Sequence, residues 1–257
     1  MNLTAGLESA QDWIVPGVAA TVAAPLVGAG VVALGVGGRT PRNVAVGAGT
    51  AALAAGLGVA AAWQVGDGVP VGWGESLGGG RFVFIDGLNA LLIPFVALIA
   101  TATMLVAPRR LLDGPGVRRA LVGLAATLAL FATSHPLALV ALWIATAQPT
   151  WRATRTTPGG RGAARVFAIY MSMAVVCMAA GTCMLVADPP WERSHGGVGT
   201  AGAWLVAVAV MIRKGIFPFH SWYPALFSGA PMSTALLATQ PQVASYTAVR
   251  LLVGHAA

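Results

Sequence analysis

Long apolar runs separated by short polar segments limit the folds that this chain can adopt. The runs cover residues 14–37, 44–65, 87–106, 120–150, 166–186 and 200–212. A helix of about 20 apolar residues crosses the ~30 Å hydrocarbon layer of a membrane. Charged side chains make up only 9% of the 257 residues, whereas a soluble domain carries about 25%. The chain is therefore predicted to be an integral membrane protein.

Helices rather than β-strands are expected to make the crossings. Barrel strands need about ten residues of alternating polarity, whereas these runs are longer and are rich in Ala, Gly, Val and Leu. Within a bilayer a spanning segment must satisfy its own backbone N–H and C=O groups. We therefore expect an all-α integral membrane protein, a helical bundle of about seven to eight transmembrane segments.

The run at 120–150 is too long for a single crossing. Its centre is Ser134-His135-Pro136, a combination that favours a turn and interrupts a helix. We expect two helices joined at His135. One long tilted helix is the less favoured alternative.

The arginines alternate between the loops in a way that predicts orientation. Ten arginines lie in the segments 38–43, 107–119 and 151–165, whereas the N-terminal segment and the intervening loops hold only Arg81 and Arg193. The ten are Arg39, Arg42, Arg109, Arg110, Arg118, Arg119, Arg152, Arg155, Arg161 and Arg165. Because basic loops stay in the cytoplasm, we expect a multi-pass protein of a bacterial inner-membrane type cell membrane, with its N-terminus outside the cytoplasm.

Several function classes find no support in the residues. The basic clusters form no face on a soluble fold, so no nucleic-acid partner is expected. No cofactor and no metal site are expected, because Cys177 and Cys183 lie six residues apart in one apolar run and no pair of histidines is centred in facing helices. No catalytic site is expected, since Ser221 and Ser233 lack an acid partner near His220.

All eight acidic residues lie in loops or at the ends of apolar runs. Proton and cation carriers usually hold a carboxylate in the centre of a membrane helix. Its absence is evidence against a pump that works without partner subunits.

Residues 211–250 carry the candidate chemistry, and they read MIRKGIFPFHSWYPALFSGAPMSTALLATQPQVASYTAVR. We expect a helix that is broken around 214–231. The break-forming residues are expected to be Pro218, Pro224, Gly229 and Pro231. Such breaks occur at membrane depth only where the freed backbone is covered by protein or lines a hydrated cavity.

Two ionisable side chains flank the expected break. Lys214 is the only lysine of the sequence, and a buried amine changes its protonation state readily. His220 can relay protons near neutral pH. The alternative is that Arg213 and Lys214 only mark a membrane interface and that His220 only caps a loop.

The string from Lys214 to Pro224 and the Gly229-Ala-Pro-Met-Ser segment after it resemble the broken seventh helix of antiporter-like subunits. These belong to respiratory complex I, multi-subunit Na+/H+ antiporters, membrane-bound hydrogenases and inorganic-carbon pumps. The family pattern is close to K-x-x-x-x-PFHxWLPDA, followed by PTPVSALxHA. Weaker similarities are Asp86-Gly-Leu-Asn to the start of the third helix, Leu142-Trp143 to the fifth, and Arg165-Val-Phe to the sixth. The resemblance spans about residues 82–250.

The resemblance implies a domain organisation and a set of proton-path residues. Residues 1–112 would form three leading transmembrane helices, and residues 113–257 part of an antiporter-like repeat with a broken helix at 200–250. Lys214 corresponds to the lysine of the seventh helix, and the proton-path candidates are Lys214, His220 and Thr239. The family's glutamate after Trp143 is Ile144 here, and its histidine beyond the break is Thr239.

The resemblance leaves two functions open. The first is a membrane subunit of an ion-translocating complex similar to NADH:quinone oxidoreductase, with Lys214 in the hydrated path and carboxylates supplied by other membrane subunits. The alternative is a structural subunit that holds its partners, for example in an inorganic-carbon pump, without carrying protons. Family members are much longer, so a fragment, a split half and a reduced relative all stay open, as does the choice between H+ and Na+.

Overall fold

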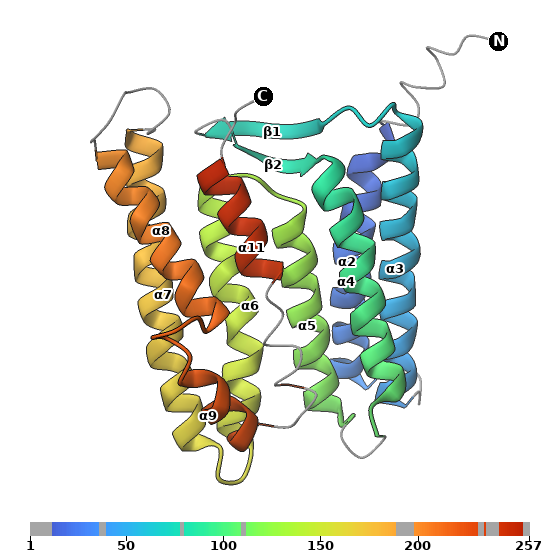
Figure 1. Cartoon of the computed structure of the whole chain (residues 1–257). Helices are drawn as coiled ribbons and strands as arrows, with labels where there is room; N and C mark the ends of the chain where they lie inside the picture. Colours follow the sequence, from blue (N-terminus) through green and yellow to red (C-terminus); the bar gives the residue numbers. More distant parts are fainter. Residues whose placement is uncertain are drawn as a thin grey trace, which may run out of the picture. The chain divides into compact units, whose positions relative to one another are not determined.

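A computed structural model describes residues 12–35, 40–77, 80–108, 112–188, 198–230, 234 and 242–253. The described residues contain nine α-helices, a short π-helix and one two-stranded sheet (Figure 1). They form two compact units, which comprise the described residues of 1–75 with 81–133 and those of 76–80 with 134–257. The fold is thus mostly helical, as the apolar runs predict.

The first unit is built from four helices. They are α2 (Ile14–Leu34), α3 (Pro41–Val65), α4 (Gly87–Val106) and α5 (Gly114–Phe131). Helix α3 packs against both α2 and α4, and α5 packs against α2. Small residues make this close packing possible. A Cβ atom added at Gly28 would lie only 2.6 Å from the Cβ atom of Ala48, and one at Gly49 would lie 2.6 Å from Oγ1 of Thr101.

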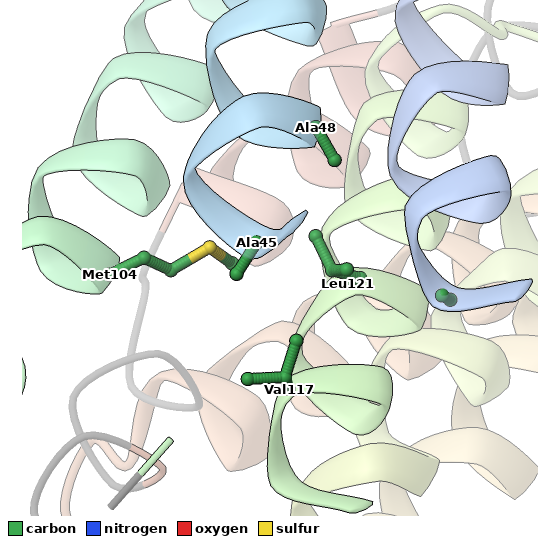
Figure 2. Close-up of a cluster of buried hydrophobic side chains, with 6 residues drawn as sticks. Ala45, Ala48, Met104, Val117 and Leu121 are labelled. Atoms are coloured by element: carbon green, nitrogen blue, oxygen red, sulfur yellow. The ribbon is translucent and has the colours of Figure 1, made fainter. Parts of the chain in front are cut away.

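A cluster of buried side chains occupies the interior of the first unit. Figure 2 shows side chains from α3, α4 and α5 in this cluster, with Leu121 lying between Val117 and Ala48. Its members are Ala29, Ala45, Ala48, Met104, Val117 and Leu121, all at most 9% exposed. Alanines on α2 and α3 pack with the larger residues Met104, Val117 and Leu121 of α4 and α5, so small and large side chains complement each other in this cluster.

A β-hairpin corrects the expectation of an all-α protein. Strands β1 (Val71–Leu77) and β2 (Gly80–Ile85) pair with each other in the 66–81 loop and the residues just after it. The amide of Phe84 donates to the carbonyl of Ala132 at 2.9 Å, and Oγ1 of Thr133 donates to the carbonyl of Arg81 at 3.2 Å. The hairpin was missed because it lies between the apolar runs, although the Phe-Val-Phe-Ile sequence of β2 favours a strand.

The Asp86-Gly-Leu-Asn motif begins helix α4. One carboxylate oxygen of Asp86 accepts from the amides of Leu88 and Asn89 at 3.1 and 3.2 Å, while the Asp86 amide donates to Oδ1 of Asn89 at 2.6 Å. These bonds form a capping box, which satisfies amides that have no partner within the helix. The carboxylate of Asp86 is therefore engaged in holding the helix end.

The second unit is arranged around α7. Its elements are α6 (Pro136–Thr156), α7 (Arg161–Ala187), α8 (Val198–Lys214), α9 (Trp222–Gly229), α11 (Gln242–Ala248) and the π-helix η3 (Val249–Val253). Helix α7 packs against α6, α8 and α9, and α11 packs against α8. The contact between α7 and α8 is close because Gly181 faces Gly202, so that the two backbones approach each other.

The predicted division of the 120–150 run is confirmed. Helix α5 ends at Phe131 and α6 begins at Pro136, the first helical position, where proline is tolerated because the amide would lack a partner there. His135 caps α6, with its Nδ1 atom accepting from the amide of Ala138 at 3.4 Å. This histidine thus has a structural role at a helix end.

Within the described ranges, four helices are long and apolar enough to cross a membrane, judged by length and composition. They are α2, α3, α4 and α7. Crossings by α5, α6 and α8, and hence the total of seven to eight segments, stay predictions. The predicted division of the chain after residue 112 also stays a prediction, since it concerns membership of a repeat and not compactness.

We predict that Gly181→Leu destabilises the protein. A Cβ atom at this position would lie 2.7 Å from the Gly202 carbonyl oxygen and 2.9 Å from the amide of Val206, so α7 and α8 must separate. Overpacking of this kind costs ~1–3 kcal/mol. The measurement is the unfolding temperature of the full chain in detergent. Gly162→Leu on the same helix is the control, because a Cβ atom there has nothing within 4 Å; equal effects of the two changes would contradict close packing at Gly181.

Candidate functional site at the end of helix α8

Helix α8 ends in a turn that glycine makes possible. Gly215 has a φ of +63°, a left-handed conformation that side chains with a Cβ atom adopt at a cost. Its amide donates to the Ile212 carbonyl at 3.0 Å, and the amide of Ile216 donates to the Met211 carbonyl at 3.0 Å. This pair of bonds is a Schellman motif, which satisfies carbonyl groups at the helix end.

The predicted interruption is present, but its cause is only partly as expected. Gly215 ends α8, and a Cβ atom at this position would collide with the ring of Tyr223. Pro218 lies in the non-helical segment 215–221, whereas Pro224 lies in the first turn of α9, where a proline fits. Gly229 is the last residue of α9, and Pro231 lies outside the described residues. Glycine directly after two basic residues is the signal that indicates this helix end.

Trp222 packs the interruption against α7. Its side chain is only 1% exposed and contacts Phe167 in an edge-to-face geometry, with ring centroids 5.5 Å apart. The indole Nε1 donates to the Ile212 carbonyl at 2.8 Å, which gives that carbonyl a second donor in the last turn of α8. The tryptophan therefore has a packing role, as its position in the break indicates.

A second contact places the interruption beside the interior of α7. The hydroxyl groups of Tyr170 and Ser221 are 2.5 Å apart. Tyr170 lies nine residues after the start of α7, which has 27 residues, and so about 13 Å along a helix of about 40 Å. The interruption thus lies well inside the length of a helix that is long enough to cross a membrane.

Arg213 is the most tightly held cation of this site. Its guanidinium donates to the Trp143 carbonyl at 2.8 Å and to Oγ1 of Thr146 at 2.6 Å, and its Cζ atom lies 4.6 Å from the Trp143 ring centroid. Trp143 is 1% exposed, so the ring provides a buried cation–π surface. The side chain of Arg213 therefore links the end of α8 to α6. The sequence patterns alone did not identify this contact.

The described residues of the second unit offer little negative charge to this guanidinium. Asp188 is the one carboxylate among them; it follows the far end of α7 and accepts from the amide of Gly199 at 3.5 Å. Arg213 is therefore stabilised by a carbonyl dipole, a hydroxyl and an aromatic face within this part of the chain. A guanidinium stays protonated under such conditions, so this charge is permanent.

Position 144, which the resemblance assigns to a glutamate, does not face this cation. Ile144 is 48% exposed, whereas its neighbour Trp143 is buried. Successive residues of a helix point about 100° apart, so α6 directs Trp143 inward and Ile144 outward. Isoleucine thus replaces the glutamate that the resemblance places at position 144, and this position lies on an exposed face of α6.

The three predicted proton-path residues have different placements. Lys214 is half-buried, and its amine makes no hydrogen bond or ion pair with the described part of the chain. His220 is exposed and stacks on Phe217 at a centroid distance of 5.9 Å. They lie at the two ends of segment 215–221, and no contact joins them among the described residues. Thr239 lies outside the described residues.

Known proteins match parts of the sequence. No family model matches it. Subunit N of the NADH-quinone oxidoreductase of Mycobacterium tuberculosis is 33% identical over 90 residues, which are 34% of this chain and 17% of that protein. Subunit N from Neisseria gonorrhoeae is 44% identical over 54 residues, which are 20% of this chain and 11% of that protein. The matched segments thus cover less than a fifth of these curated relatives.

Solved structures match almost the whole described fold. A chain of respiratory complex I from Thermus thermophilus with bound aureothin has a TM-score of 0.72 and 20% identity, over 90% of this chain and 53% of that one. A chain of the Mrp complex from Dietzia sp. has a TM-score of 0.70 and 18% identity, over 91% and 48%. The archaeal membrane-bound sulfane sulfur reductase gives 0.67 and 16%, over 91% and 42%. This chain therefore has the fold of the matched membrane-complex chains and spans about half of their length. These matches confirm the resemblance to antiporter-like membrane subunits that residues 82–250 predicted.

Proposed function

We propose that this chain is a membrane subunit of a multi-subunit ion-translocating complex. The observation that carries the proposal is an interrupted helix, α8, that ends in two half-buried cations, Arg213 and Lys214, and packs against the membrane-length helix α7. Ionisable side chains at membrane depth are expensive to maintain and mark ion or proton paths. The chain would cross the membrane seven to eight times with its N-terminus outside the cytoplasm.

Within this proposal the cations of α8 have separate tasks. Arg213 is held by α6 and keeps its charge. Lys214 is half-buried and its amine has no partner in the described residues, and the proposal assigns the moving charge to this side chain. In this proposal the exposed side chain of His220, at the other end of the interruption, would relay protons between the ion path and the surface of the chain. Carboxylates would come from other membrane subunits, because the described second unit has only Asp188.

The kind of complex is proposed from the matched proteins. These proteins belong to an NADH-quinone oxidoreductase, an Mrp complex and a membrane-bound sulfane sulfur reductase. We infer that this chain assembles in the membrane with other subunits of such a complex. The segment from Arg213 to Gly229 would then form part of the ion path, and the catalytic chemistry would lie in other subunits.

A structural role is the second candidate, and two observations favour it. In the family pattern K-x-x-x-x-PFH the lysine lies five positions before the proline. Five positions before Pro218 lies Arg213, whereas Lys214 lies only four positions before it. The lysine's register thus holds a guanidinium that does not release a proton. Ile144 also replaces the glutamate. In this candidate function the interruption only shapes the subunit that partner chains contact.

We predict that Lys214→Ala lowers ion translocation by the assembled complex at least about fivefold, the effect of losing roughly 1 kcal/mol of stabilisation of the charged intermediate. Proton translocation is measured with a pH-sensitive dye in proteoliposomes. Coupling is the ratio of this translocation to the rate of electron transfer or of cation exchange that the same complex catalyses. Lys214→Arg keeps the charge without proton release, so it should lose coupling as well. Unchanged coupling in both variants would leave the structural role.

We predict that Arg213→Gln destabilises the fold by ~1–3 kcal/mol, because the Trp143 carbonyl and the Thr146 hydroxyl lose a charged donor in a half-buried place. The unfolding temperature of the full chain in detergent reports this. Arg155→Gln is the matched control, since Arg155 also lies over a tryptophan, Trp151, at 5.2 Å but is exposed. Similar shifts of the unfolding temperature for both variants would mean that the contact of Arg213 with α6 does not stabilise the fold.

We predict that the α6–α7 turn faces the cytoplasm and that the 66–70 segment faces the other side. In a chain with Cys177→Ser and Cys183→Ser, a membrane-impermeant maleimide added to intact cells should label Pro70→Cys and not Pro158→Cys. Both prolines are exposed in the structure. Permeabilised cells serve as the control for reactivity, and the reverse pattern of labelling would reverse the proposed orientation.

A further inference from the structure

Four exposed arginines surround the turn between α6 and α7. They lie in the last two turns of α6 and the first two turns of α7, and a short turn at 157–160 connects these helix ends. We call them the α6–α7 arginine cluster: Arg152, Arg155, Arg161 and Arg165. The yellow helices α6 and α7 lie side by side and meet at this end (Figure 1). The cluster thus concentrates four positive charges at one end of a helical hairpin.

No carboxylate from the same hairpin compensates these charges. The sequence contains no Asp or Glu between Asp113 and Asp188, and none of the four arginines forms an ion pair with the described residues. Arg155 lies over the ring of Trp151 at 5.2 Å, which orients its guanidinium without neutralising it. The cluster therefore has the capacity to bind an anion from outside the chain.

An apolar stripe continues from the cluster along α7. Counting from Arg165 in steps of four, four and three residues reaches Ile169, Met173 and Val176, which share one helical face. Their side chains are 60%, 39% and 67% exposed. Near its start, a Cβ atom at Gly162 would have nothing within 4 Å, so the surface beside Arg161 and Arg165 is open.

We propose that the α6–α7 arginine cluster binds the phosphate of an anionic phospholipid whose acyl chain lies along Ile169, Met173 and Val176. Guanidinium groups form bidentate bonds with phosphate oxygens, and basic pockets beside membrane helices bind anionic headgroups. A free phosphate or an acidic peptide matches the charges but not the stripe that follows them. A phospholipid matches both, and the half-buried Trp151 beside Arg155 is of the residue type that is enriched at headgroup layers.

The test is lipid selectivity of the full chain in nanodiscs of equal parts phosphatidylglycerol and phosphatidylcholine with the same acyl chains. Native mass spectrometry measures the ratio of the two lipids that remain bound after release. Each basic residue near an anionic surface is worth about fivefold in binding, so Arg161→Gln combined with Arg165→Gln should lower the ratio more than about tenfold. Arg118→Gln, an exposed arginine on α5, is the control for the general attraction of one basic residue and should lower the ratio no more than about fivefold.

Water-soluble glycerophosphoglycerol, the headgroup without acyl chains, distinguishes a lipid from a free phosphate. It should not displace bound phosphatidylglycerol at the same concentration. Displacement would show that the phosphate alone is recognised and would overturn the role of the stripe. Equal retention of both lipids by the wild-type chain, or the same loss in Arg118→Gln, would overturn the site. Loss of a copurifying acidic subunit in the double variant without any change in lipid ratio would assign the cluster to a protein partner instead.

Discussion

The end of α8 is the constraint on which the candidate site depends. A helix that stops beside the interior of a membrane-spanning helix leaves carbonyl groups that no water in a hydrocarbon layer can satisfy. Two groups of this chain solve the problem. Gly215 adopts the left-handed turn that returns two amides to the helix end, and the Trp222 indole adds a third donor at the Ile212 carbonyl. The aromatic packing on Phe167 then holds the segment in place.

This local solution also explains how a cation can be kept next to the interruption. Burying a charge is costly unless hydrogen bonds and a polarisable surface replace its hydration. Arg213 obtains both from α6, through one carbonyl, one hydroxyl and the face of Trp143. Arg213 and Lys214 are thus adjacent in sequence but held differently, since α6 binds the guanidinium whereas the amine of Lys214 has no partner among the described residues. The two proposed functions differ in the task that they give to Lys214.

Several features of the fold and the site follow from local sequence. The turn at His135 was predictable because Ser-His-Pro interrupts an overlong apolar run, and α6 begins at Pro136. The interruption after Lys214 was predictable because prolines follow the cations. Gly215 was overlooked as its cause, although a glycine after the last basic residues signals a helix end. The role of Arg213 was not predictable, since its partners lie about seventy residues away on α6.

The sequence by itself determined that the chain is a membrane-spanning helical bundle, because length and polarity of the apolar runs leave no other solution for the backbone. Local sequence also determined some helix ends, such as the start of α6 at Pro136 and the end of α8 before Gly215, since prolines and glycines act over a few residues. Tertiary structure alone decided that α6 binds Arg213 while the Lys214 amine has no partner in the part of the chain that the structure describes, and that Ile144 faces outward while Trp143 faces in. These outcomes depend on the rotation of each helix against its neighbours, which is set by side chains far apart in the sequence.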